Sequence, residues 1–201
     1  LGSAGVGHIT LVDDDAVDLT NLQRQSAHTS ERVGQPKVTS AAEAVLAINP
    51  DAAITCIQAR ADAALLDGLV ATATVVLDCT DNYATRHAIN AACVRHTKPL
   101  VVGAAIRFDG QITVVDPRQM NAPCYACIFA PNAEFEEMQC ATMGVFAPLV
   151  MSVGSWQAGQ ALRLLAGLPV AAGQLQLLDM ERGNWQQLQL QRQAACPICA
   201  H

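Results

Sequence analysis

The first half of the chain alternates between short apolar runs and longer segments whose apolar residues recur at helical spacing. Because the apolar runs are almost unbroken, they predict strands that are buried on both faces. These predicted strands are residues 8–13, 53–59, 74–79 and 99–104, and the helices between them are residues 34–50, 62–71 and 83–97. Strand and helix follow one another over short links, which predicts an α/β fold with a Rossmann-like, mostly parallel sheet and crossover helices.

The pattern changes after Ala104. The segment "IRFDGQITVVD" predicts a hairpin that turns at Asp109-Gly110. Residues 119–144 show little periodicity, a helix is predicted over most of 147–166, and alternating residues on both sides of Gly183-Asn184 predict a C-terminal β-hairpin. We therefore expect one domain, with an α/β part over 1–118 and a less regular part over 119–201.

Composition narrows the class of protein. Hydrophobic residues make up 51% of the chain and charged residues 15%, so the core is large relative to the charged surface. A net charge of -6 argues against a nucleic-acid partner, which selects for a basic face. No apolar run reaches the ~18 residues of a membrane span, and no signal peptide is visible. We expect a cytoplasmic protein.

The eight cysteines do not fit a disulfide scaffold, since such chains are shorter and poorer in core residues. Four of them form two CxxC pairs, Cys124 with Cys127 and Cys196 with Cys199. Two such pairs are typical of one tetrahedral, structural Zn²⁺ held by four thiolates, which would tie the chain's end back to residue 124. The alternative is a pair of redox-active dithiols.

The strand over 8–13 ends in three acids. In doubly wound sheets, ligands bind at the carboxyl ends of the strands, and an acid after the second strand can bind a ribose hydroxyl, which assigns Asp13. The matching glycine-rich loop belongs ~20 residues upstream, before the first residue. The segment "LGSAGVG" instead resembles a helix end capped by Gly5, so the chain is expected to start inside the first helix. A solvated turn is the alternative for Asp13.

Two further polar clusters follow. Asn21, Arg24 and Lys37 come shortly after the acids, and both cations are of the kind that contacts phosphate. Asp81 and Asn82 follow another strand, and a carboxylate beside a polyphosphate most naturally holds Mg²⁺. Taken alone, this pair would be a helix N-cap. The clusters together favour a nucleoside triphosphate site.

The motifs "LVDDDAVDLTNLQRQ", "VGQPK", "LDCTDN", "GAAIRFDGQITVV" and "PCYAC…CPIC" resemble the HesA/MoeB/ThiF family, bacterial relatives of the ubiquitin-activating enzymes. The resemblance spans essentially the whole chain and is closest to the molybdopterin-synthase branch. It implies a homodimer that uses ATP and Mg²⁺ to adenylate the C-terminal Gly-Gly carboxylate of a ubiquitin-like sulfur carrier.

The resemblance also assigns roles to individual residues. Asp13 would contact the ribose, Asp81 with Asn82 would bind metal and nucleotide, and the catalytic residues would be Asp81, Arg24 and Lys37. The expected phosphate contacts are Thr20, Asn21, Leu22, Gln23, Arg24 and Lys37. Cys140 lies in the segment that resembles the family's crossover loop, where it is either a sulfur-transfer thiol or a bland exposed cysteine.

Two departures from the family bear on activity. The glycine-rich loop is missing, and so is the N-terminal region whose arginine reaches the partner subunit's active site. The chain as given can therefore lack activity while its full-length parent is active. The alternatives are the same chemistry on the thiamine-pathway carrier, and a non-catalytic homologue that only docks a carrier.

Overall fold

The structure is a computed structural model that describes residues 1–131 and 144–200. The chain divides into two compact units, Leu1–Ala61 and Asp62–His201, and each is described by itself. The predicted division near residue 118 stays a prediction.

The first unit is a parallel strand pair with a crossover helix. Strand β1 (His8–Val12) pairs in parallel with β2 (Ala53–Ile57), and α1 (Lys37–Leu46) lies between them in the sequence. Three short 3₁₀ helices complete the unit: η1 (Gly2–Ala4), η2 (Leu19–Asn21) and η3 (Ser30–Arg32). Gly5 ends η1 in the left-handed conformation (φ 80°), which confirms the predicted glycine cap.

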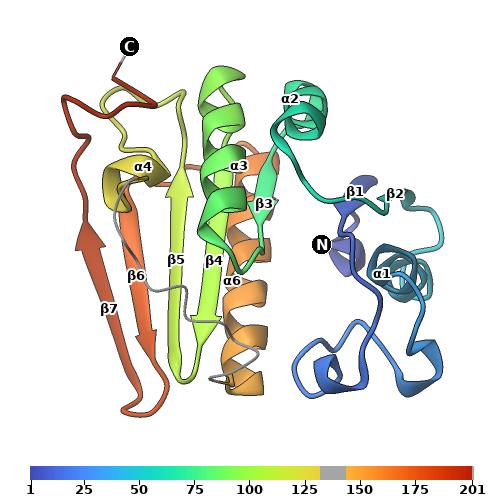
Figure 1. Cartoon of the computed structure of the whole chain (residues 1–201). Coiled ribbons are helices and arrows are strands. Elements are labelled where there is room, and N and C mark those ends of the chain that lie inside the picture. Colours follow the sequence, from blue (N-terminus) through green and yellow to red (C-terminus); the bar gives the residue numbers. More distant parts are fainter. Residues whose placement is uncertain (132–143, 201) are drawn as a thin grey trace. The chain divides into compact units, whose positions relative to one another are not determined.

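The second unit is built on a five-stranded sheet with the order β3-β4-β5-β6-β7 (Figure 1). Its strands are β3 (Val76–Asp78), β4 (Leu100–Ile106), β5 (Asp109–Val115), β6 (Gln174–Asp179) and β7 (Asn184–Gln189). Its helices are α2 (Ala63–Thr72), α3 (Tyr83–Arg95), α4 (Tyr125–Ile128) and α6 (Ala147–Leu165). Strands β3 and β4 are parallel, and the other three pairs are antiparallel. The predicted α/β class, its parallel strand pairs and the C-terminal hairpin are confirmed.

Helices cover both faces of this sheet, with α3 in front and α6 behind in the view of Figure 1. Leu149 and Val153 of α6 pack against Ile112 and Leu178, and all four are almost fully buried. Asp62 caps α2 by accepting a hydrogen bond from the Leu65 N–H (2.9 Å), as its sequence position predicts. The sheet and α6 together form the core of the second unit.

The turn of the first hairpin is not where the sequence predicts it. Ile106 pairs with Asp109, so the turn consists of Arg107 and Phe108, and Asp109-Gly110 lies inside β5. A Cβ atom on Gly110 would come within 2.7 Å of Leu149 Cδ1 and 3.0 Å of a Val153 methyl carbon. Gly110 is therefore required by the close approach of α6 rather than by the turn, and this explains the error.

Among the described helices, none combines the length and the hydropathy that crossing a membrane requires.

Candidate nucleotide and metal sites

The loop between β3 and α3 is held from three directions. The Asp78 carboxylate accepts hydrogen bonds from the backbone N–H (2.9 Å) and the hydroxyl (2.8 Å) of Thr80. Arg86, from the first turns of α3, donates to the Thr80 carbonyl. Asn82 is the N-cap of α3 and accepts from the Thr85 N–H at 2.8 Å. The loop that carries Asp81 thus has its conformation fixed without using Asp81.

Asp81 is exposed and makes no hydrogen bond or ion pair with any residue that the structure describes. Its neighbour Asn82, not Asp81, provides the cap of α3. The capping interpretation therefore applies to Asn82, and the Asp81 carboxylate is left available for a ligand.

Asp78 and Arg86 are a buried pair of opposite charge, 1% and 7% exposed. Burial raises the pKa of the Asp78 carboxyl, while the positive charge of Arg86 and the hydrogen bonds from Thr80 oppose that rise. Because the Asp78 carboxylate is buried and accepts two hydrogen bonds from Thr80, its role is to fix the conformation of the loop between β3 and α3.

The acids of the first unit are also partly engaged with one another. Asp13 is half-buried and accepts a hydrogen bond from the Asp15 N–H (2.9 Å). Asp15 in turn forms an ion pair with Lys37 (Nζ to Oδ2, 2.7 Å). Arg24 donates to the Thr20 carbonyl at 3.2 Å. Lys37 and Arg24 are thus oriented by local partners that a phosphate group would have to compete with.

The segment predicted to contact phosphates forms η2 and the turn after it. Asp18 is its N-cap, accepting from the N–H (2.8 Å) and the hydroxyl of Thr20, while the Asn21 side chain accepts from the Asp18 N–H (3.1 Å). The hydrogen bonds from the hydroxyl and the N–H of Thr20 lower the pKa of Asp18, and burial opposes this only weakly. Leu22 and Gln23 follow in the turn. The Thr20 and Asn21 side chains therefore have a structural role as well as their predicted one.

The four cysteines of the CxxC pairs converge in the second unit. Their sulfur atoms all lie within 4.8 Å of one another, with Cys124 Sγ 3.6 Å from Cys196 Sγ and Cys127 Sγ 3.5 Å from Cys199 Sγ. A disulfide would bring two sulfurs to ~2.05 Å, so none of the four is disulfide-bonded. Four thiolates at about 2.3 Å from one ion in a tetrahedron would be about 3.8 Å apart, which fits this cluster.

The surroundings of the cluster act differently on its individual thiols. Burial alone would raise the pKa of Cys196, but the N–H groups of Ile198 and Cys199 outweigh it and lower the pKa to about 7. The Gln193 N–H donates to Cys127 Sγ at 3.5 Å, and the Asn90 amide donates to Cys124 Sγ at 3.7 Å. Hydrogen bonds of this kind orient thiolate ligands around a metal. Burial raises the pKa of Cys124 and Cys127, so a cation is needed to keep all four ionised.

Sequence reasoning missed Arg86 and Asn90. Both belong to the predicted helix over 83–97, four positions apart in "RHAIN". That spacing puts them on one helix face, a signal that could have been found. Whether that face is buried depends on what packs against it, which the local sequence does not contain.

The two halves of the predicted nucleotide site lie in different units, so their assembly into one site stays a prediction. Asp13, Arg24 and Lys37 belong to the first unit, and Asp81 and Asn82 belong to the second. Cys140 lies outside the described residues.

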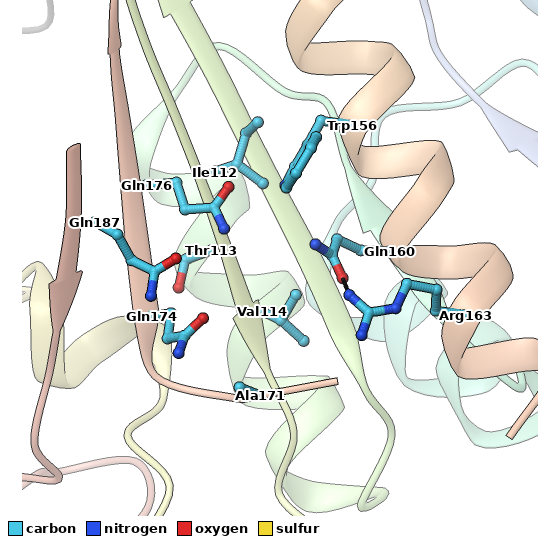
Figure 2. Close-up of a pocket in the computed structure, with 10 residues that line it drawn as sticks. All are labelled: Ile112, Thr113, Val114, Trp156, Gln160, Arg163, Ala171, Gln174, Gln176 and Gln187. Atoms are coloured by element: carbon cyan, nitrogen blue, oxygen red, sulfur yellow. Dashed lines mark hydrogen bonds between the residues drawn. The ribbon is translucent and has the colours of Figure 1, made fainter. Parts of the chain in front are cut away.

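A cavity of about 230 Å³ opens beside α6 over strands β5 to β7, and Figure 2 shows its lining. Amide side chains dominate it, and its one cation, Arg163, already donates to Gln160 (3.3 Å) and to the Pro169 carbonyl. The lining residues are Ile112, Thr113, Val114, Trp156, Gln160, Arg163, Ala171, Gln174, Gln176 and Gln187. None of the predicted site residues is among them.

The fold and the cluster define an α/β protein with a four-cysteine site of metal-binding geometry. The chain belongs to the ThiF family, whose profile matches residues 1–198. The molybdopterin-synthase adenylyltransferase of Escherichia coli K12 is 46% identical over 99% of this chain and 80% of its own length. The sulfur carrier protein ThiS adenylyltransferase of the same organism is 43% identical over 99% of this chain and 78% of its own length.

Solved structures show the same fold at lower identity. Escherichia coli MccB with ATP superposes with a TM-score of 0.82 at 20% identity, over 98% of this chain and 60% of that one. The selenomethionine structure of PaaA superposes with a TM-score of 0.76 at 18% identity, over 96% of this chain and 59% of that one. This chain therefore spans about three fifths of those solved chains.

Proposed function

We propose that the full-length protein adenylates the C-terminal Gly-Gly carboxylate of a ubiquitin-like sulfur carrier in molybdopterin cofactor biosynthesis. Relatives above 40% identity over nearly the whole chain have the name adenylyltransferase. The observation that carries the proposal is the exposed carboxylate of Asp81, which bonds to no described residue and lies on a loop that Asp78, Arg86 and Asn82 hold in place.

In the proposed reaction a carrier carboxylate oxygen attacks the α-phosphorus of ATP. The new O–P bond forms as the bond to the β-phosphate oxygen breaks, and pyrophosphate leaves with its electron pair. Asp81 would hold Mg²⁺, which when bound would neutralise phosphate charge, while Asn82 caps α3 beside it. Arg24 and Lys37 supply further positive charge, and Asp13 orients the ribose. Positioning and charge neutralisation account for most of the catalysis, since no covalent enzyme intermediate is needed.

A second carrier fits the comparisons nearly as well. The relative named for ThiS is 43% identical, against 46% for the molybdopterin-synthase relative, and the small difference does not separate the two pathways. ATP–pyrophosphate exchange by the full-length parent, with each Gly-Gly-tailed carrier in turn, separates them. We expect faster exchange with the molybdopterin-synthase carrier. Faster exchange with the thiamine-pathway carrier would reassign the pathway, and no exchange with either would leave the docking homologue.

We further propose that the four-cysteine cluster holds one structural Zn²⁺. Cys124, Cys127, Cys196 and Cys199 would fill all four positions, leaving none open for a substrate. The spacing of the sulfur atoms and the N–H donors around them support this. Reduced thiols in this cluster also support a cytoplasmic location. Metal analysis of reduced, unchelated protein should find about one zinc per chain.

We also propose that the full-length parent is a homodimer. The rings of Trp156 and Trp185 meet edge to face with centroids 4.9 Å apart, yet they remain 39% and 48% exposed. Met151, elsewhere on α6, is 47% exposed. Exposed apolar side chains of this size gather at interfaces. Sedimentation at micromolar concentration should show a dimer, and a monomer would contradict the proposal.

A further inference from the structure

Helix α3 carries a polar stripe where a helix normally packs apolar residues. Arg86 is 7% exposed and Asn90 is 0% exposed, and they lie four positions apart on one face. Burying an arginine or an amide is costly unless its polar groups are bound. The partners of these two side chains therefore show what the stripe holds in place.

Arg86 binds the loop that presents Asp81. Its guanidinium donates to the carbonyl of Thr80, the residue immediately before Asp81. It also lies close enough to Asp78 to oppose the rise in that residue's pKa. Asp78 is bound to Thr80 through one carboxylate oxygen, and the other oxygen is buried without a hydrogen bond to any described residue. Arg86 is thus a source of positive charge for this buried acid and a direct support of the loop.

Asn90 binds the metal-binding loop. Its amide nitrogen donates to Cys124 Sγ (3.7 Å), and its oxygen accepts from the Tyr125 N–H (2.9 Å). Both polar ends of one fully buried side chain are therefore used on two consecutive residues, the first of which is a predicted zinc ligand. Such contacts fix the orientation of a metal ligand.

Tyr125 also packs against α3. It is 1% exposed, and its ring lies edge to face with His87, at 5.2 Å between centroids. Tyr125 thus contacts α3 through its backbone N–H, which donates to Asn90, and through its ring. The contacts of Cys124 and Tyr125 thus converge on Asn90, and Arg86, four positions earlier on the same face of α3, contacts Thr80.

We propose that this stripe of α3 links the four-cysteine site to the Asp81 loop, with Arg86 as a positioning residue for Asp81. The metal site then does more than fasten the end of the chain. It fixes, through Asn90 and Tyr125, the helix whose Arg86 holds the proposed Mg²⁺ ligand in place. The readout by ATP–pyrophosphate exchange rests on the proposed function, whereas the readout by hydrogen–deuterium exchange does not.

The test compares Arg86→Lys, Asn90→Ala and Asn90→Ser with a matched control, Arg95→Lys. Arg95 is on the same helix, is exposed and pairs with Asp67 at 2.6 Å, outside the stripe. Lysine keeps the charge but loses the planar fork of donors. Hydrogen–deuterium exchange of residues 79–85 is measured in each zinc-loaded protein. Arg86→Lys and the Asn90 variants should exchange this segment at least several-fold faster than wild type, and Arg95→Lys should not.

The second readout is the Mg²⁺ concentration that half-saturates ATP–pyrophosphate exchange in the full-length parent. It should rise about fivefold or more in Arg86→Lys, at unchanged zinc content, and stay at the wild-type value in Arg95→Lys. Arg86→Lys behaving like Arg95→Lys in hydrogen–deuterium exchange would overturn the positioning role. If the Asn90 variants speeded hydrogen–deuterium exchange only at residues 124–127 and not at 79–85, the link would be overturned. If Asn90→Ala does not fold, Asn90→Ser provides this measurement. A wild type without pyrophosphate exchange would refute the proposed function, while hydrogen–deuterium exchange would still test the link.

Discussion

Asp81 and Asn82 are adjacent in the chain but have opposite surroundings. Asn82 is engaged as the cap of α3, and Asp81 is exposed without a bonding partner among the described residues. The sequence offers capping and metal binding as alternatives for the pair. The structure gives the cap to Asn82, because a cap needs only one side chain at one backbone position, and metal binding by Asp81 stays a prediction.

We predict that Asp81→Asn lowers ATP–pyrophosphate exchange of the full-length parent by ~10²-fold or more, since it removes a charge that the transition state needs. The melting temperature and zinc content should hardly change, because Asp81 makes no hydrogen bond with any described residue. Asp62→Ala is the matched contrast: it removes the cap of α2 and should cost ~1 kcal/mol of stability with little effect on exchange. Exchange by Asp81→Asn within a few-fold of wild type would remove Asp81 from the site.

A second residue-level prediction concerns pH. Burial, followed by the positive charge of Lys37, lowers the pKa of His28 below its usual 6.5, and burial lowers the pKa of His87. As pH falls through about 6.5, the unfolded chain takes up protons that the folded chain does not. The free energy of unfolding should therefore fall between about pH 7.5 and pH 5.5.

The measurement is denaturant unfolding at several pH values in that range. His28→Gln cannot titrate at this position and should show a smaller loss of stability on acidification. His8→Gln, at an exposed histidine of the same unit, is the control. A loss in His28→Gln as steep as in wild type would exclude His28 as a cause.

At the scale of elements, the sequence predicts what depends on local chemistry. The strand and helix alternation, the Asp62 cap and the hairpin at Gly183 follow from periodicity and turn residues, and the structure has all of them. The turn at Arg107-Phe108 could not be found in this way. The glycine in "FDGQ" is required by the close approach of α6, a helix some forty residues later in the chain.

We predict that Gly110→Ala destabilises the protein by ~1–3 kcal/mol, because its methyl group would press on Leu149 and Val153 in a packed core. Gly68→Ala is the matched control. Gly68 lies inside α2 with no atom within 4 Å of the added Cβ, so alanine should stabilise the helix by ~0.5–1 kcal/mol. Chemical denaturation of both variants measures the difference, and equal effects would contradict the packing argument.

At the scale of the whole molecule, the sequence predicts the long-range contact between the two CxxC pairs, because paired cysteines are typical metal ligands. The two CxxC pairs predict that Cys124 and Cys196, 72 positions apart, meet at one site, and their sulfur atoms lie 3.6 Å apart. The stripe of Arg86 and Asn90 gives no such signal, because amide and guanidinium side chains are common on exposed helix faces. Its role depends on which loops pack against α3, and the sequence pattern does not specify that packing.

We expect a metal at the four-cysteine cluster to hold the C-terminal end of the chain in place. Few other bonds tie residues 190–200 to the described fold; they include the Gln193 side chain to the Cys127 carbonyl (2.7 Å) and the Leu190 N–H to the Gly173 carbonyl (2.8 Å). Cys196→Ser should therefore lose the metal and lower the melting temperature by ~5–10 °C, since metal binding is coupled to folding. Cys56→Ser, at an exposed thiol outside the cluster, should change neither. Calorimetry and metal analysis test both variants. If Cys196→Ser kept its zinc and its melting temperature, Cys196 would not be a ligand that the metal requires, and a metal bond through it would not be what holds the end of the chain.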